Sequence, residues 1–335
     1  MESLAATYLQ PLDAVMRDIV SRHLPDEPGF GVMLRYALGW EDDQGTPYYQ
    51  PTGKRLRPLM LLLCAHALHD EWQRALPAAA AVELLHNFSL IHDDIQDASP
   101  LRHRRPTVWK VWGIPNAINA GDAMFTLAYA ALADLAATVS ASNMVQIWQM
   151  FNHTNLELTR GQHLDMRFES QLSVTVDEYI SMILGKSAAL IATCARLGAF
   201  IVSGNAEQAA HFAEFGLNLG IAFQIRDDIL GIWGEEAVTG KSASTDIDSR
   251  KKSLPVLYAL EQSPALQTIY ADPTNPIDSS EIVRLLDDVG ARDYALSQEA
   301  HYYQQAINAL DRAAPRAAMR PALDAFVDFL LNRQY

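Results

Sequence analysis

The sequence contains only two cysteines, Cys64 and Cys194, among its 335 residues. Two thiols are too few for a disulfide framework or a thiolate metal site, which favours a reducing compartment. The first residues also lack the basic region and apolar core of a signal peptide. We therefore expect a cytoplasmic protein.

Basic charge is scarce as well, because 26 Lys and Arg face 40 Asp and Glu, for a net charge of −14. Binding to a nucleic-acid backbone needs an excess of Lys and Arg, so nucleic acid is not an expected partner. The longest stretch without Asp, Glu, Lys or Arg, residues 135–156, carries polar residues throughout. It is interpreted as a buried helix, and no integral membrane segment is expected.

Sustained apolar–polar alternation and Asn-Gly or Asp-Gly turns are missing, which argues against a sheet protein. Apolar residues instead recur at three- and four-residue steps, as in helices. These helical runs cover residues 54–70, 74–97, 116–138, 141–168, 176–203 and 205–230. The length would suit two domains, but no low-complexity linker divides the chain. We expect residues 1–335 to form one all-α domain, a helical bundle around a central cavity.

An acidic cluster, Asp93-Asp94-x-x-Asp97, ends one helical run. On a helix Asp93 and Asp97 share one face about 6 Å apart, a separation that cations can bridge. Crowded carboxylates repel one another without a cation, and oxygen ligands suit Mg²⁺, which often shares its shell with substrate phosphates. The cluster indicates a magnesium site, although a solvated acidic helix end would show the same pattern.

A second acidic pair, Asp227-Asp228, also lies near the end of a long helical run, which Gly231 is expected to stop. Carboxylates that hold Mg²⁺, with Arg and Lys close behind, are typical of a diphosphate site. Both clusters are followed by such residues, and a third basic group opens a helix. The basic residues are Arg102, His103, Arg104 and Arg105 after the first cluster, Lys241, Arg250, Lys251 and Lys252 after the second, and Lys54, Arg55 and Arg57 at the helix start.

The order and spacing of these motifs resemble the trans-isoprenyl diphosphate synthases, the family of farnesyl and geranylgeranyl diphosphate synthases. The resemblance covers about residues 50–260. One such motif would be weak, whereas the ordered set is specific. The set comprises Gly-Lys-Arg-Leu-Arg-Pro (53–58), Glu83-x-x-His86, the run 90–97, Arg102 with Pro106-Thr107, Gly121-Asp122, Gly161-Gln162-x-x-Asp165, Lys186-Ser187, Phe223-Gln224-x-x-Asp227-Asp228, Gly240-Lys241, Asp246 and Lys251-x-Ser253-x-Pro255.

The resemblance implies the isoprenoid synthase fold, a homodimer, and a Mg²⁺-dependent head-to-tail condensation with three ions per site. Metal held by Asp93, Asp97 and Asp227, in clusters that include Asp94 and Asp228, would grip the allylic diphosphate. The double bond of isopentenyl diphosphate would attack the allylic cation, and a proton would then leave. Such a reaction needs no nucleophilic side chain, which agrees with the lack of a Ser-His-Asp or Cys-His pattern.

Carried over position by position, the resemblance implies three groups of site residues. Lys54, Arg57 and His86 would bind isopentenyl diphosphate; Arg102, Lys186, Lys241 and Lys251 would bind the allylic diphosphate; and Gln224, the Ser187 hydroxyl and the Lys186 backbone would face the developing cation. Without the family, His86 would be interpreted as a buried structural histidine. Gln162 and Asp165 fit an interhelical hydrogen bond as well as they fit a functional role.

Of the departures from the family pattern, two bear most on these assignments; Ser187 in place of the usual threonine keeps the hydroxyl, and nothing is concluded from Trp109 where histidine is frequent. His103 stands where a second arginine usually contacts isopentenyl diphosphate, so His103 is the candidate there, with Arg104 or Arg105 as possible substitutes. Gly231 replaces the last aspartate of the second cluster. Metal binding by that cluster would therefore depend on Asp227, with Asp228 nearby.

Product length is expected to depend on Phe88 and Ser89, which lie about one turn before Asp93. In the family an aromatic residue at the Phe88 position shortens the product. The pattern favours geranylgeranyl diphosphate (C20), with farnesyl diphosphate (C15) next, although Phe88 could simply be core packing.

Two other functions remain open at this point. A class I terpene cyclase would share the fold and the first cluster, but it would normally carry an Asn/Asp-x-x-Ser/Thr-x-x-x-Glu motif near Asp227, which is not found. A non-catalytic partner subunit of a heteromeric prenyl synthase would explain Gly231 and His103 as partial losses.

Overall fold

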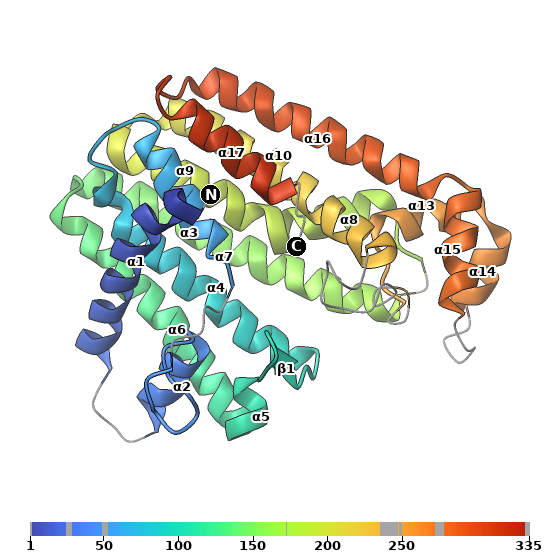
Figure 1. The fold of residues 1–335 in the computed structure, drawn as a ribbon, viewed down its shortest axis with the longest axis horizontal. Coiled ribbons are helices and arrows are strands. Elements are labelled where there is room, and N and C mark those ends of the chain that lie inside the picture. The colour runs from blue at the N-terminus through green and yellow to red at the C-terminus, as the bar shows by residue number, and fades with distance from the viewer. Residues whose placement is uncertain are drawn as a thin grey trace. The chain divides into compact units, whose positions relative to one another are not determined.

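The computed structural model describes residues 2–24, 29–48, 53–171, 173–234, 247, 250–271 and 278–331. Helices dominate it, and one two-stranded antiparallel sheet interrupts them (Figure 1). The elements up to α6 are α1 (Glu2–His23), α2 (Phe30–Ala37), α3 (Leu56–His66), η1 (Trp72–Ala75), α4 (Leu76–Gln96), β1 (Leu101–Arg102), β2 (Arg105–Pro106), α5 (Val108–Trp112) and α6 (Ile114–Ala133). The later elements are η2 (Asp134–Ala137), α7 (Ala141–Ser170), α8 (Val176–Ile183), η3 (Leu184–Ala188), α9 (Ala189–Ser203), α10 (Ala206–Trp233), α13 (Leu254–Gln262), α14 (Pro264–Ala271), α15 (Ser279–Asp288), α16 (Ala291–Ala313) and α17 (Arg320–Leu331).

The chain forms two compact units, the first made of Met1–Trp148 with Leu197–Gly204. Its central helix is α4, which packs against α6, α3 and α1. The run Ala78–Ala81 of α4 is fully buried, and these small side chains let neighbouring helices approach closely. Figure 1 shows α4 beside α6, with the β1–β2 hairpin and α5 at one end of the pair. The acidic cluster lies at this end of α4.

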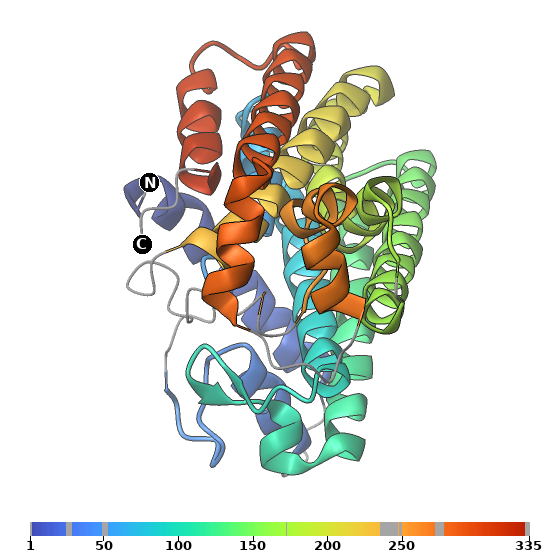
Figure 2. The ribbon, with the colours of Figure 1, turned by 90° about the vertical axis from the view of Figure 1, so that its right-hand side faces the viewer.

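The second unit comprises Gln149–Arg196 and Asn205–Tyr335. Its long helix α10 lies along α16, and α17 also contacts α10. An apolar core that includes Tyr179, Ile225 and Leu254 joins α8, α10 and α13. The shorter helices α14 and α15 pack against each other and face the viewer in Figure 2, in orange. This core fixes the part of α10 that carries the second acidic pair.

The all-helical prediction is confirmed, and each helical run found in the sequence corresponds to helix in the structure. One detail is different at Gly231, because α10 continues through this residue to Trp233 and is capped by Gly234. Hydrogen bonding within the helix therefore outweighs the low helix propensity of a single glycine.

The interpretation of residues 135–156 as one buried helix is wrong. The stretch is divided between η2 and α7. On α7, Val145, Trp148 and Leu156 are 54%, 46% and 70% exposed. The absence of charged residues does not by itself show burial, since an exposed apolar helix face can also be an interaction surface.

A different stretch, Val176–Ser203, is long and apolar enough to cross a membrane by length and composition. In its most apolar 18-residue window 56% is buried inside the chain, and the stretch is interrupted by the π-helical turn η3. Both features fit a core helix of a folded chain.

Candidate active site

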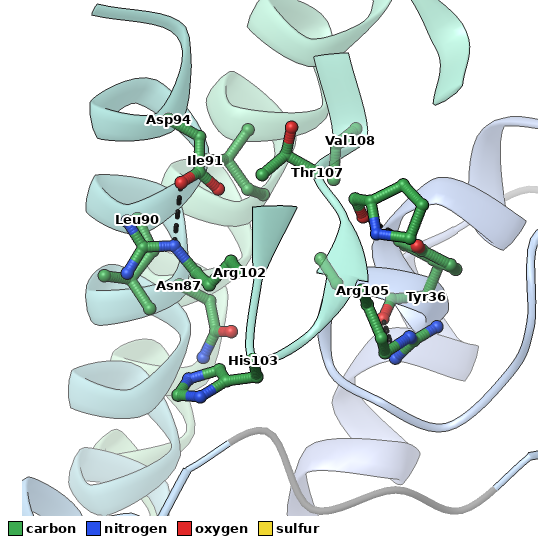
Figure 3. A pocket seen from close by; sticks show the side chains of 12 residues that line it. Tyr36, Asn87, Leu90, Ile91, Asp94, Arg102, His103, Arg105, Thr107 and Val108 are labelled. Carbon is green, nitrogen blue, oxygen red and sulfur yellow. Dashed lines mark hydrogen bonds and ion pairs between the residues drawn. The ribbon is translucent and has the colours of Figure 1, made fainter. Parts of the chain in front are cut away.

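The first acidic cluster lies at the carboxyl end of α4, where Arg102 of β1 reaches back to it. The Arg102 Nε donates to Asp94 Oδ1 at 2.8 Å (Figure 3), and Nη2 donates to Asp93 Oδ2 at 3.2 Å. Asp94 is 5% exposed, and burial raises its pKa while Arg102 opposes the rise. Asp97 follows at the helix C-cap and is exposed. In this cluster Asp94 is thus buried, Asp93 is half-buried and Asp97 is exposed.

The strands β1 and β2 are joined by a two-residue turn, His103 and Arg104, with φ of 50° and 63°. Positive φ at both turn residues is the geometry that Asn-Gly normally supplies, which is why turn residues gave no hairpin signal. Trp109, on the following helix, donates its indole N–H to the Ser99 carbonyl at 2.9 Å. Thr107 donates to the same carbonyl, so two residues that follow the hairpin hold the segment between α4 and the hairpin at Ser99.

The residues of the hairpin point in two directions (Figure 3). His103 lines a pocket shared with Asn87 and extends toward α4. Arg105 points to the other side, where it donates to the Tyr36 and Glu41 carbonyls at 3.3 and 3.0 Å and lies over the Tyr36 ring. Through these contacts Arg105 attaches the hairpin to the segment that contains Tyr36 and Glu41. Arg104 does not line this pocket, so His103 stays the candidate.

The basic start of α3 divides into residues with different roles. Arg55 has φ 47°, and its guanidinium donates to Asp13 at 2.9 Å and lies 3.9 Å from buried Glu83. Arg55 therefore ties α3 to α1 and α4. Lys54 is exposed, whereas Arg57 is half-buried and contacts His86 of α4. The structure thus brings together Arg57 and His86, as their common predicted role requires.

His86 is held as a neutral imidazole. Its Nε2 lies 3.0 Å from Arg57 Nη1. Because guanidinium only donates, Nε2 accepts and the ring proton is on Nδ1. Burial lowers the pKa of His86 well below its usual value, and the positive charges of Arg57 and Arg102 lower it further.

This pKa predicts that the folded chain loses stability on acidification. The unfolded chain gains a proton on His86 as the pH falls through about 6.5, whereas the folded chain does not. The contribution is therefore fully present above that pH and is lost as the pH falls toward the lowered folded-state pKa. His86→Gln is expected to lose less unfolding free energy than the wild type between about pH 7.5 and about pH 5.5 in urea titrations. His301→Gln, at an exposed position, is the control; equal losses in all three chains would contradict the prediction.

In the second unit, Asp227 and Asp228 lie on α10 in different surroundings. Asp227 is half-buried, whereas Asp228 is fully buried (0% exposed). Asp228 accepts from the Tyr179 hydroxyl, from the Leu254 backbone N–H at 3.2 Å and from Lys251 at 3.3 Å. These donors favour a structural role for Asp228, and its assignment as a metal ligand stays a prediction.

Lys186 and Ser187 lie in η3, a π-helical turn between α8 and α9. Such a turn breaks the regular i to i−4 ladder and commonly marks functional sites. The Lys186 ammonium pairs with Asp165 of α7, which supports a positioning role for Asp165. Ser187 donates its hydroxyl to Gln224 Oε1 at 2.7 Å. Three predicted site residues of this unit are thus adjacent.

Two further predicted residues follow α10. Lys251 reaches Asp228, and its side chain remains 39% exposed. Lys241 lies outside the described residues. Lys252 donates to the Phe168 carbonyl at 2.6 Å, so it acts as a structural tie.

Phe88 lies on α4 in an aromatic row. Its ring centroid is 5.0 Å from that of Phe125 on α6 and 4.8 Å from that of His92. Phe125 in turn contacts Tyr129, at 5.1 Å. Ser89 donates back to the His86 carbonyl at 2.8 Å, which uses its hydroxyl within the helix. The row extends from the acidic end of α4 along α6.

The carboxylates present fit Mg²⁺ by donor chemistry, because oxygen is the ligand that Mg²⁺ prefers. Among the residues that the structure describes, no three Asp, Glu, His or Cys side chains converge on one point. Arg102 supplies the positive charge beside Asp93 and Asp94. A few protein carboxylates, completed by water and substrate phosphate, match the usual Mg²⁺ shell better than an all-protein cage.

Sequence reasoning missed Tyr179, Asp13 and Asn87. Tyr179 gave no signal beyond being a polar aromatic in a helical run, and its link to Asp228 spans 49 positions. Asp13 precedes the motifs altogether, and its contact with Arg55 spans 42 positions. Contacts of this range follow from packing and not from local spacing.

The helical fold with an acidic helix end in each unit defines an isoprenoid synthase. The crystal structure of a polyprenyl synthetase from Streptomyces coelicolor matches with a TM-score of 0.90 at 32% identity, covering 98% of this chain and 99% of that one. Residues 43–287 match the polyprenyl synthetase family. The chain therefore belongs to this family, the trans-isoprenyl diphosphate synthases, and is a trans-prenyltransferase.

Two relatives indicate the breadth of the likeness. A geranylgeranyl diphosphate synthase of Mycobacterium tuberculosis is 37% identical over 309 residues, covering 90% of this chain and 86% of the relative. A (2E,6E)-farnesyl diphosphate synthase of Mycobacterium bovis is 33% identical over 317 residues, covering 92% of this chain and 87% of the relative. These names support a short-chain prenyltransferase.

Proposed function

We propose that this chain condenses isopentenyl diphosphate head-to-tail with an allylic diphosphate, in the presence of Mg²⁺, to give a short-chain (E)-prenyl diphosphate. The observation that carries the proposal is that each acidic helix end combines a partly exposed aspartate with basic side chains. Asp93 lies beside Arg102 in one unit, and in the other Asp227 is followed by Asp228, which accepts a hydrogen bond from Lys251.

In the proposed reaction Asp93, Asp97 and Asp227 would hold Mg²⁺, which supplies charge stabilisation to the departing diphosphate. Arg102, Lys186, Lys251 and Lys241 would bind that diphosphate as it leaves. Gln224 and Ser187 would present oxygen to the allylic cation. Excluding water from this cation prevents its hydrolysis.

Isopentenyl diphosphate would bind to Lys54, Arg57 and His86, with His103 beside them. Arg57 supplies the charge, since the neutral His86 can donate only through Nδ1. The double bond then attacks the allylic carbon, and loss of a proton gives the product. We also propose that residues 1–335 act as the single domain expected from the sequence.

We favour geranylgeranyl diphosphate (C20) as the product and place farnesyl diphosphate (C15) next. Relatives with both names match the chain, so identity alone does not select one. Phe88 beside Phe125 makes an aromatic barrier one turn before Asp93.

Phe88→Ala is expected to lengthen the product because it removes the first ring of the aromatic row. Phe125 and Tyr129 would still limit chain growth, so the product should become longer by about one or two isoprene units. Chromatography of dephosphorylated products measures it. Phe326→Leu, in the core of α17, controls for general loosening; an unchanged distribution for Phe88→Ala would show that Phe88 does not limit the chain.

A direct test of the function is to incubate the purified chain with Mg²⁺, isopentenyl diphosphate and, in turn, dimethylallyl, geranyl and farnesyl diphosphate. Prenyl diphosphates of defined length are expected, and EDTA should abolish them. No product with any primer would overturn the proposal and favour a non-catalytic partner subunit. A cyclic hydrocarbon formed without isopentenyl diphosphate would indicate a terpene cyclase.

We further propose that the protein is located in the cytoplasm.

We also propose that the protein is a homodimer. Val145, Trp148 and Leu156 form an exposed apolar stripe on α7. Val145 and Leu156 are about three helical turns apart and so share one face, and Trp148 lies one turn beyond Val145 at its edge. A second copy of the chain would cover this stripe. Trp148→Glu should shift the mass measured by light scattering from dimer to monomer.

A further inference from the structure

Asp228 is the meeting point of four hydrogen-bond donors in the core of the second unit. Its Oδ2 accepts from the Tyr179 hydroxyl and from the Leu254 backbone N–H, the latter at 3.2 Å. Its Oδ1 accepts from Gln224 Nε2 and Lys251 Nζ, each at 3.3 Å. Asp228 is 0% exposed, so these donors take the place of water.

Tyr179 anchors this carboxylate from a fixed position. Its side chain is 1% exposed and belongs to the apolar core that also contains Leu254 and Ile225. The ring cannot move without disturbing that packing. The hydroxyl therefore holds Asp228 Oδ2 in place, and Oδ1 is left facing Gln224, one turn earlier on α10.

This placement decides which way the Gln224 amide points. A carboxylate only accepts hydrogen bonds, so Gln224 must turn its NH₂ group toward Asp228. Its carbonyl oxygen then faces Ser187, whose hydroxyl donates to it at 2.7 Å. The reverse orientation would set the Gln224 oxygen against the Asp228 carboxylate, and it would turn Ser187 into an acceptor with its proton directed elsewhere.

We propose that Tyr179 and Asp228 are positioning residues that set the polarity of the Gln224–Ser187 pair, so that the pair offers oxygen lone pairs to an allylic cation. The only Ser187 hydroxyl proton is used on Gln224, which leaves lone pairs on the remaining side of Oγ. Fixed dipoles of this polarity stabilise positive charge without reorganising during the reaction. The inference rests on the proposed function, because the allylic cation forms when the diphosphate leaves in that reaction.

The test compares two ligands that differ in charge. 2-(Dimethylamino)ethyl diphosphate carries an ammonium nitrogen where the tertiary carbon of the dimethylallyl cation is positive, and 3-methylbutyl diphosphate is its uncharged isostere. Calorimetry with Mg²⁺ gives the ratio of their dissociation constants. Tyr179→Phe should reduce the preference for the ammonium compound about tenfold, the scale of one hydrogen bond to a charged group, and leave the uncharged compound unaffected.

Tyr294→Phe is the matched control, because this tyrosine packs against the same core from α16. It should keep the wild-type ratio. A Ser187→Ala chain should show a lowered ratio that Tyr179→Phe lowers little further, because the two changes act on the same group. Full additivity of the two effects would contradict positioning through this pair.

The outcomes separate the two proposals. If the wild type forms prenyl diphosphates and Tyr179→Phe keeps the wild-type preference, the positioning role is overturned and the function stands. If the wild type forms no product with any primer, the proposed function fails on that assay alone. If circular dichroism shows that Tyr179→Phe is unfolded, Asp228→Asn gives a second measurement. The amide introduced at position 228 can donate a hydrogen bond, so the Gln224 amide would be free to adopt the reverse orientation. An unchanged ligand ratio for Asp228→Asn would likewise overturn the role.

Discussion

Asp93→Ala is expected to reduce prenyl diphosphate formation by about a thousandfold, the scale of losing one electrostatic or metal-binding group at a reacting centre. The loss should appear in kcat at saturating Mg²⁺. Asp93 lies within 3.2 Å of Arg102 and is only partly buried, with 21% of its side chain exposed. Both features suit a carboxylate that exchanges a protein partner for a cation.

The structure also explains why this variant should fold. Arg102 keeps its stronger contact, the 2.8 Å bond to Asp94, when Asp93 is removed. No buried charge is left without a partner, so the large cost of breaking a buried ion pair does not apply. Asp70→Ala is the matched control, since this aspartate is 84% exposed in the same unit. Retention of more than about a tenth of the activity by Asp93→Ala would remove Asp93 from the proposed metal site.

Gly161→Ala is expected to lower the free energy of unfolding by about 2–3 kcal/mol and to abolish most activity. A helical glycine replaced by alanine ordinarily gains about 1 kcal/mol. At Gly161 the added Cβ would overlap the backbone of Gly185 and Lys186 in η3. Two backbones cannot separate by rotating a side chain, so η3 would have to shift and carry Lys186 and Ser187 with it.

Gly31→Ala provides the contrast in the helix α2. There the added Cβ would meet the Arg35 guanidinium at 2.6 Å, which is the movable end of a long side chain. Urea titration should therefore show little change or a small gain for Gly31→Ala. If both alanine variants behave alike, the contact between Gly161 and η3 does not constrain the site.

Apolar periodicity and charge grouping are local signals, so they were enough to predict the helical class and the position of both acidic groups late in a long helix. Helix α1 was missed, and it contains Pro11, a residue that local rules treat as a helix breaker. The β1–β2 hairpin was missed because His103 and Arg104 adopt positive φ without being glycine or asparagine. In both cases tertiary packing overrides a local preference.

The difference between the two adjacent aspartates of each cluster could not be predicted either. Asp227 and Asp228 are adjacent in sequence, so composition and spacing treat them alike. They differ only in what packs around them, which is Tyr179 and Leu254 for Asp228. The same is true of the first cluster. Arg102 contacts both adjacent aspartates, but Asp94 is buried and Asp93 is only half-buried.

The π-helical turn η3 also constrains which changes in chain length the enzyme can tolerate. A π turn holds one residue more than a regular α turn, so deleting one residue within Leu184–Ala188 would restore a continuous α-helix. Because one full turn is kept, the helix beyond the deletion would stay in phase with α8, and Tyr179 would keep its place. Only the residues inside the turn would be redistributed about the helix axis, and these include Lys186 and Ser187. A one-residue deletion here would therefore displace two site residues while the helices on either side keep the faces that they present to their neighbours.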